Sequence, residues 1–405
     1  MNTLPDPTCA PAMAQLLSLL ARDASSWPED VGAWTEDAWD DVIKLAAQHG
    51  LSPLLYHRLS DIALPDSVRA RLRRHYLRTA ADNTRRFAAL EEALLALHQA
   101  DVPIILLKGA HLASLVYGNI ALRPMVDIDL LVEERNALRG LEILSKLGYE
   151  PVKGEAWMSL RHGHHGMRRA DGLLLELHQR VGAFSVGTSV DQAGIWERAI
   201  HTTLGDAPAM VLDAEDLLLH TCIHSASQHL LQMGLMPLYD VQKILSHYGA
   251  QIMSEVIVDR AREWRVARAV FLMLSLSQTL LGATVDPAML EALAPPDAQD
   301  HLNMGMRILL NDTTHDTAPS GNLVALWGEH SWRARLGVLG RVLLPGTDRM
   351  RSLYAVPADR PVHPWLYLRR WADILAHRGS SVRQMLGRPD RDIDWQSLVR
   401  WLAQG

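Results

Sequence analysis

Two short apolar runs interrupt a chain whose apolar residues otherwise recur at helical spacing: VPIILLKG at 102–109 and VDIDLLV at 126–132. Runs of this length, rich in branched residues, are typical of buried β-strands. The segments 110–118 and 135–148 return to helical spacing, and each ends in glycine. Residues 164–181 contain two strand-like segments on either side of an Ala-Asp-Gly turn, which predicts a β-hairpin. This order of elements predicts a small α/β unit.

The sequence therefore predicts an α+β protein that is mainly helical overall. A small mixed-sheet core is expected over residues 101–185, after an N-terminal helical region over 1–100. From about residue 190 the pattern becomes helical again. It predicts a second helical region over 186–310 and a C-terminal extension of loops and helices over 311–405.

Several predicted helices are marked by residues that cap their ends. Thr35 precedes two acidic residues, and the helix that it begins is expected to end before Gly50. Asp213, with Asp216 three residues on, begins another helix in a pattern like a capping box. The helical pattern at 65–100 carries many arginines, which we expect to form a solvated face and not a nucleic-acid site.

Composition narrows the class of protein. The chain has 405 residues and a net charge of −6, so we expect no strong general binding to nucleic acid. Two cysteines are too few for a disulfide framework, which favours a reducing compartment. The amino terminus lacks the basic segment of a signal peptide, and the most apolar stretch, 266–283, reads as a core helix and not as a membrane span. The expected location is the cytoplasm, with no membrane partner.

Two aspartates, Asp127 and Asp129, lie within the second apolar run. Residues two apart in a strand point to the same face, so the two carboxylates project together while Ile128 and Leu130 face the other way into apolar surroundings. Neighbouring carboxylates repel unless one is protonated or a cation lies between them. Oxygen ligands at this spacing suit Mg²⁺ or Mn²⁺, while the alternative is a pair of strand-end residues that cap backbone amides.

A third acidic residue, Glu176, lies among leucines in the last strand of the predicted hairpin. If that strand pairs with 126–132, Glu176 completes a three-carboxylate cluster able to hold one or two metal ions. Gly109 ends the first strand, where a glycine lets the backbone approach a ligand closely. The position of Gly109 on the strand before the aspartates favours a phosphate-bearing ligand.

The stretch LLKGAHLASLVYGNIALRPMVDIDLLV, followed by LLLELH and LLLHTCIH, resembles a nucleotidyltransferase-like family of bacterial proteins within the DNA polymerase β-type superfamily. The resemblance implies metal-dependent transfer of a nucleoside monophosphate from a nucleoside triphosphate to an acceptor. It implies that Gly109 is the turn glycine, that Asp127 and Asp129 bind the metal and that Glu176 is the third acid. The chain departs from the pattern in having Ala110 where a serine is usual, and Lys108 before the glycine offers a charged contact instead.

Further residues have two readings each. Arg123 is expected either to contact the triphosphate or neutralise the acidic cluster, or to be an ordinary loop arginine. His178 should share a face with Glu176 and either bind phosphate or orient the acceptor, or hydrogen-bond the carboxylates as a structural residue. The resemblance makes His224 and Asp240 candidates to line an acceptor pocket on the helical region over 186–310, against core packing as the alternative.

Two groups of histidines were weighed as zinc ligands. His220 and His224 are four residues apart on one helix face, but the glutamate of a zincin motif is missing. His162, His164 and His165 lack well-ordered ligand spacing. We expect this second group to form a loop or strand edge near the substrate.

The sequence thus predicts an Mg²⁺- or Mn²⁺-dependent nucleotidyltransferase that acts on a nucleoside triphosphate. Asp127 and Asp129 hold the metal, Glu176 completes a second metal position and assists deprotonation of the acceptor, and Lys108 and Gly109 position the triphosphate. The acceptor is a small molecule, a peptide or a protein. Two alternatives are a related phosphoryl or glycosyl transfer and a non-catalytic nucleotide-binding or toxin–antitoxin-type module.

Overall fold

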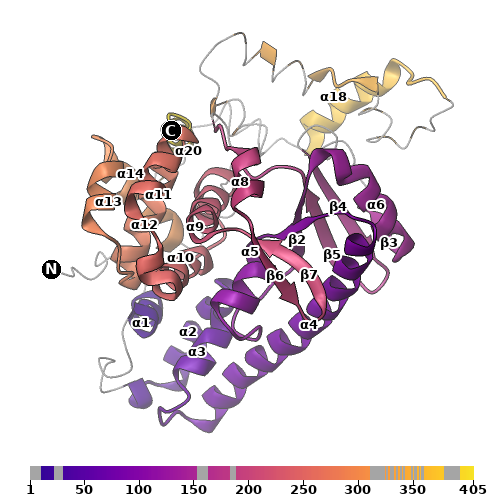
Figure 1. Ribbon diagram of the computed structural model, residues 1–405. Helices are drawn as coiled ribbons and strands as arrows, with labels where there is room; N and C mark the ends of the chain where they lie inside the picture. The colour runs from indigo at the N-terminus through magenta and orange to yellow at the C-terminus, as the bar shows by residue number, and fades with distance from the viewer. Residues whose placement is uncertain are drawn as a thin grey trace.

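The computed structural model describes residues 11–21, 31–152, 163–182, 188–310, 360–377 and 393–405, together with isolated positions between 324 and 356. The described residues form an α+β fold that is mainly helical, as predicted. Figure 1 shows a sheet at the right, a long helix beneath it and a bundle of helices at the left.

Seven strands form one mixed sheet in the order β3-β4-β5-β2-β1-β7-β6. The strands are β1 Ile104–Leu106, β2 Ile128–Val132, β3 Tyr149–Pro151, β4 His164–Arg169, β5 Leu174–His178, β6 Ile200–Leu204 and β7 Ala207–Val211. The pairs β2–β5 and β1–β7 are parallel, and the other neighbours are antiparallel. The predicted hairpin at 164–181 is confirmed as β4 and β5, with Gly172 at a φ of +87° in the turn between them.

The helices before and around the first strands are α1 Pro11–Ala21, α2 Glu36–Gln48, α3 Ser52–Arg58, α4 Asp66–Gln99, α5 Lys108–His111 and α6 Ala137–Lys146. Those after the hairpin are α8 Gln192–Arg198, α9 Ala214–Cys222, α10 Met236–Tyr248, α11 Ser254–Glu263, α12 Ala267–Leu281, α13 Pro287–Leu293, α14 Ala298–Leu310, α18 Trp365–His377 and α20 Trp395–Leu402. A short π-helical turn follows α5 over Leu112–Val116, and another follows α9 over Ile223–Gln228.

The two faces of the sheet pack into different apolar cores. Ile128 and Leu130 of β2 join a core with residues of α4 and α6, which confirms that they face away from the aspartates. Leu131 of β2 and Ile105 of β1 join the larger core that contains α9, α10 and α12. Side chains alternate in direction along a strand, so the aspartate face is the one that meets the helical bundle.

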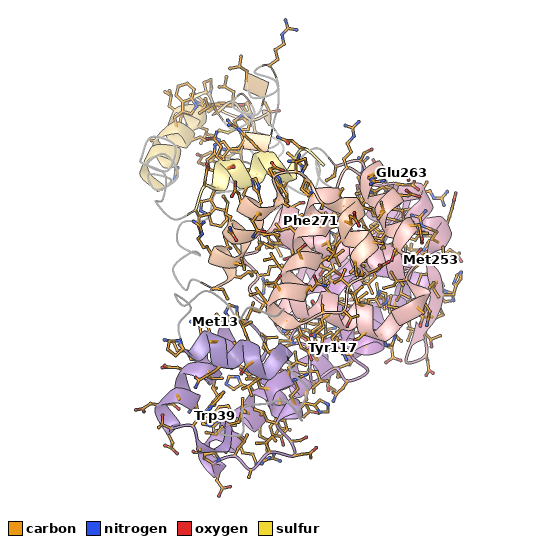
Figure 2. The ribbon with its side chains drawn as sticks, turned by 90° about the vertical axis from the view of Figure 1, so that its left-hand side faces the viewer. Met13, Trp39, Tyr117, Met253, Glu263 and Phe271 are labelled. Atoms are coloured by element: carbon orange, nitrogen blue, oxygen red, sulfur yellow. The ribbon has the colours of Figure 1, made fainter. Side chains whose placement is uncertain are left out.

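The larger core also links the N-terminal helices to the bundle. Figure 2 labels Met13 and Trp39 on the N-terminal helices, Phe271 of α12 above them, and Tyr117 to their right. All four residues are buried in this one core. Helices α1 to α3 and the start of α4 therefore share one core with the bundle, while the later part of α4 covers the other face of the sheet.

Most of the predicted helix ends are confirmed. Thr35 caps α2 by accepting a hydrogen bond from the Ala38 amide at 3.3 Å, and Gly50 follows that helix with a φ of +72°. Asp213 caps α9 by accepting from the Asp216 amide at 2.7 Å. The apolar stretch at 266–283 forms α12, whose middle is buried. Among the described residues, no helix combines the length and the apolar character needed to cross a membrane.

The prediction of helical structure from about residue 190 is wrong over 200–211, which form the hairpin of β6 and β7. A two-residue turn, Gly205 and Asp206, joins the two strands, with Gly205 at a φ of +56°. Gly-Asp is a hairpin signal that the sequence does contain. β7 pairs with β1, so this hairpin extends the sheet beside the glycine turn.

Candidate active site

Strand pairing brings the predicted acidic residues together. β2 and β5 run parallel with Asp129 directly opposite Glu176. Asp127 lies one residue before β2, so the observed strand is shorter at its start than predicted. On the other side of β5, His164 of β4 lies opposite His178. The condition set by the sequence, that the strand of Glu176 pairs beside the aspartates, is therefore met.

Each of the two inner carboxylates is held by nitrogen donors. Asp129 Oδ1 accepts from Lys108 Nζ at 2.7 Å and from His178 Nε2 at 2.7 Å. Glu176 Oε2 lies 2.7 Å from His164 Nε2 and 3.5 Å from His178 Nε2. Asp129 and both histidines are buried, and the Glu176 side chain is 18% exposed. The cluster is therefore charged, largely dry and closely connected.

The three carboxyl groups differ in their pKa values. Burial raises the pKa of Asp127 to about 6, and repulsion from Asp129 and Glu176 adds to the rise. Burial also acts to raise the pKa of Asp129, but Lys108 and His178 outweigh it and hold that pKa well below its usual range. For Glu176 the hydrogen bonds from His164 and His178 overcome the effect of burial and lower the pKa to about 2. The repulsion among the three carboxylates therefore acts mainly to raise the pKa of Asp127, and a cation beside Asp127 would relieve it.

Lys108 occupies a strained position in the turn after β1. Its φ is +44°, a left-handed conformation that is uncommon for a residue with a side chain. The conformation aims the side chain at Asp129, where the ammonium group forms an ion pair that is only 17% exposed on the lysine side. Backbone strain of this kind persists where the surroundings enforce it, and it concentrates at functional sites. The turn thus supplies a positive charge beside the predicted metal-binding pair.

Gly109 is buried next to the protein's own side chains. A Cβ atom added there would lie 2.8 Å from Arg123 Nη1 and 2.8 Å from Met125 Sδ. Real Cβ atoms essentially never come this close to another heavy atom, so the glycine makes room for these two side chains. Besides the predicted close approach of a ligand, these two side chains give an internal reason for a glycine at this position.

Arg123 is engaged with Asp240 and not with the acidic cluster. Its Nε and Nη2 atoms donate to the two carboxylate oxygens of Asp240 at 2.9 and 2.8 Å. Tyr117 also donates to Asp240, at 2.8 Å. The side chains of Arg123 and Asp240 are 11% and 2% exposed. The structure therefore assigns both residues to a buried ion pair next to the Gly109 turn.

Two histidines of the helical bundle lie on the aspartate side of the sheet. Burial, followed by the charge of Lys108, lowers the pKa of His220 to about 3 and holds that of His224 well below its usual range. Both ring nitrogens of His220 are buried and find no hydrogen-bond partner within the described part of the chain. Asp129 also acts electrostatically on both rings. The ring of His224 lies 6.0 Å from that of His220 and 4.5 Å from that of His229, while Asp240, the other residue predicted to line an acceptor pocket, lies in the buried ion pair.

The remaining histidines divide between the two sides of β4. His162 lies outside the described residues. His165 hydrogen-bonds with Gln179 at 3.2 Å, whereas its neighbour His164 reaches Glu176. The direct contact of His164 with the third acid was missed from the sequence. The turn at 170–172 could have predicted this contact, because it sets the register that places His164 opposite His178. Glu176 is two residues before His178 and so shares its face of β5.

The donor atoms at the site suit divalent cations. Carboxylate oxygens, which Asp127 and Asp129 supply, are the ligand type that Mg²⁺ and Mn²⁺ prefer. Among the described residues, one group of three side chains has its ligand atoms within 4.8 Å of one another: His164, Glu176 and His178. The arrangement can therefore neutralise the negative charge of a polyphosphate, with Lys108 adding a further positive group.

Comparison with known proteins gives one informative match. The family described as "Uncharacterised nucleotidyltransferase" matches residues 35–282 of the chain. The matched region contains the sheet, the carboxylates and α9 to α12 up to Leu281. The solved structure of the Thermotoga maritima CCA-adding enzyme complexed with tRNA is similar over 78% of this chain and 78% of that chain, with 12% identity and a TM-score of 0.21. No curated protein matches.

Proposed function

The chain belongs to the family of uncharacterised nucleotidyltransferases, and we propose that it moves a nucleoside monophosphate from a nucleoside triphosphate to a hydroxyl or phosphate of an acceptor, with a divalent metal. The observation that carries the proposal is the parallel register of β2 and β5, which sets Asp129 opposite Glu176. Asp127 joins them from the residue before β2. Neighbouring carboxylates that bind metal ions are suited to phosphoryl-group chemistry, and Asp129 and Glu176 both act electrostatically on Asp127.

Each residue has a part in this proposal. Asp127 and Asp129 hold Mg²⁺ or Mn²⁺, which when bound neutralises charge on the triphosphate and polarises the phosphorus that is attacked. Lys108 exchanges its bond to Asp129 for one to a phosphate oxygen. Glu176, opposite Asp129 on the neighbouring strand, contributes further negative charge beside the metal-binding aspartates. Because its pKa is about 2, Glu176 is a weak base, and the acceptor deprotonation expected from the sequence is not assigned to it.

Arg123 and Asp240 act indirectly in this scheme. Their ion pair fixes the chain beneath Gly109, since Arg123 Nη1 lies where a Cβ on that glycine would come within 2.8 Å. The pair therefore sets the position of the turn that carries Lys108. His224, on the bundle side of the site, is proposed to face the acceptor.

The first test uses radioactive nucleotides. Incubation with α-labelled and γ-labelled nucleoside triphosphates, Mg²⁺ and a panel of small-molecule, peptide and protein acceptors should transfer the α-label and release pyrophosphate. Transfer of the γ-label would instead establish phosphoryl transfer, and transfer of sugar from a nucleotide sugar would establish glycosyl transfer. Nucleotide bound without turnover on any acceptor would favour the non-catalytic module.

The second test removes the carboxylates. Changing Asp127 and Asp129 together to asparagine should abolish transfer, because asparagine keeps the shape and removes the charge. Asp129 is buried against Lys108 and His178, so circular dichroism checks that the double variant is folded, and Asp127→Asn alone, at the residue outside that ion pair, should lose transfer as well. Asp206→Asn is the matched control, since Asp206 is an exposed residue of the β6–β7 turn in the same sheet. Full activity in the double variant would overturn the proposal.

A further inference from the structure

Glu176 is surrounded differently from the two aspartates. Its close neighbours are the imidazole rings of His164 and His178, whose centroids lie 4.7 Å apart. The three side chains come from two paired strands, with Glu176 opposite Gly166 and His178 opposite His164. The strand register itself therefore assembles a carboxylate and two imidazoles on one face of the sheet.

The distances fit a single ion. The ring nitrogen of His164 lies 2.7 Å from Glu176 Oε2, that of His178 lies 3.5 Å from it, and all the ligand atoms are within 4.8 Å of one another. Ligand atoms around an ion with bonds of about 2.1 Å lie about 3.0 to 3.4 Å apart. To admit an ion among these three side chains, the 2.7 Å pair would open by a few tenths of an ångström, and the widest pair, at up to 4.8 Å, would close by up to about 1.4 Å. Both histidines are 8% exposed, which limits competition from water.

We propose that His164, Glu176 and His178 form a binding site for a first-row transition-metal dication, such as Zn²⁺, Fe²⁺ or Co²⁺, that discriminates against Mg²⁺. This inference rests on the proposed function, in which the neighbouring Asp127 and Asp129 bind Mg²⁺ through oxygen alone. The site would then hold two unlike metal positions, one of oxygen ligands and one dominated by nitrogen.

The ligand types carry the discrimination. Imidazole nitrogen binds zinc, iron and cobalt well, whereas Mg²⁺ prefers carboxylates, phosphates and water. Two histidines with one carboxylate leave open coordination positions, as catalytic metal sites do. His178 also bonds to Asp129 Oδ1, at 2.7 Å, so the nitrogen position is directly adjacent to the oxygen position. An ion bound by His164, Glu176 and His178 would lie beside the metal ion and phosphates that Asp127 and Asp129 are proposed to position.

Cobalt provides a readout that does not depend on activity. Metal-free wild-type protein should bind a single Co²⁺ at the triad and develop visible absorption bands characteristic of nitrogen and oxygen ligation. About a thousandfold excess of Mg²⁺ should leave this spectrum unchanged. Zn²⁺ added in equal amount should abolish it by displacement, and equilibrium dialysis of Zn²⁺ should give the same stoichiometry.

Glutamine variants separate metal ligation from hydrogen bonding. His164→Gln and His178→Gln keep an N–H donor near Glu176 but remove the imidazole, and each should weaken Co²⁺ binding by at least about tenfold to a hundredfold. His165→Gln is the matched control, because His165 is the next residue on β4 and bonds to Gln179 instead of Glu176. Circular dichroism and thermal unfolding show whether each variant is folded.

The outcomes are separable from those of the proposed function. Wild-type protein that shows no Co²⁺ spectrum, or that loses it to Mg²⁺, would overturn the inference without any variant, even if nucleotide transfer were found. Equal Co²⁺ affinity in His164→Gln, His178→Gln and His165→Gln would do the same. Specific Co²⁺ binding with no transfer to any acceptor would retain the metal site and reject the nucleotidyltransferase proposal. Asp127→Asn should lose transfer and keep the Co²⁺ spectrum.

Discussion

The buried ion pair beneath the glycine turn gives the sharpest test of how the structure supports its site. Arg123→Met removes the guanidinium and keeps a side chain of similar length. Asp240 would then remain as a charge that is 2% exposed, with the Tyr117 hydroxyl at 2.8 Å as its remaining described donor. Removing one partner of a buried pair costs about 3 to 5 kcal/mol, because the other charge is left without compensation. We expect Arg123→Met to lower the free energy of unfolding by that amount.

The double variant isolates the charge from the loss of contacts. Arg123→Met with Asp240→Asn removes both charges, so it should be more stable than Arg123→Met by about 2 kcal/mol or more. Arg180→Met is the matched control. Its ion pair with Glu134 has side chains that are 59% and 71% exposed, and exposed pairs contribute less than about 1 kcal/mol. Urea unfolding followed by tryptophan fluorescence measures all three variants.

The same experiment decides between two roles for the arginine. If Arg123 contacts the triphosphate, as the sequence analysis allowed, Arg123→Met should weaken nucleotide binding and leave stability within about 1 kcal/mol of the wild type. That result would refute the structural role. A large loss of stability that Asp240→Asn largely restores would support it.

Three further predictions concern the surroundings of the site. Gly109→Ala should reduce nucleotide transfer severalfold and destabilise the protein by about 1 to 3 kcal/mol, measured by urea unfolding, since its Cβ would meet Arg123 and Met125 at 2.8 Å. The pKa of His220 in the folded protein, about 3, lies below its unfolded value, so protonation opposes folding and stability falls as the pH drops below about 6.5. At pH 5 the free energy of unfolding should be about 2 kcal/mol lower on this account than at pH 7. His220→Leu should abolish this difference, measured by unfolding at pH 7 and pH 5. Asn83→Ala removes donors to two loop carbonyls, one of them that of Arg123 at 2.8 Å, and should lower the thermal midpoint through a loss of about 2 kcal/mol, whereas an unchanged midpoint would contradict this role.

Local sequence patterns predicted the strands and helix ends around the site to within a few residues. The strands near 104 and 128, the hairpin and the caps at Thr35 and Asp213 are all set by period and capping chemistry within a few residues. The hairpin at 200–211 was missed although its Gly-Asp turn was readable. Its strands are short, contain Pro208 and have several exposed positions, so no clear apolar alternation marks them.

The sequence by itself determined that Asp127 and Asp129 lie two residues apart at the start of a strand and that Glu176 lies in another, because local period and side-chain alternation depend on backbone geometry alone. The tertiary structure decided which strands are neighbours and in what register. That choice sets Asp129 against Glu176, brings His164 to Glu176, and joins Arg123 to Asp240 across 117 positions of the chain. Such contacts depend on burying both faces of the sheet in two different cores, a condition satisfied only by the whole chain at once.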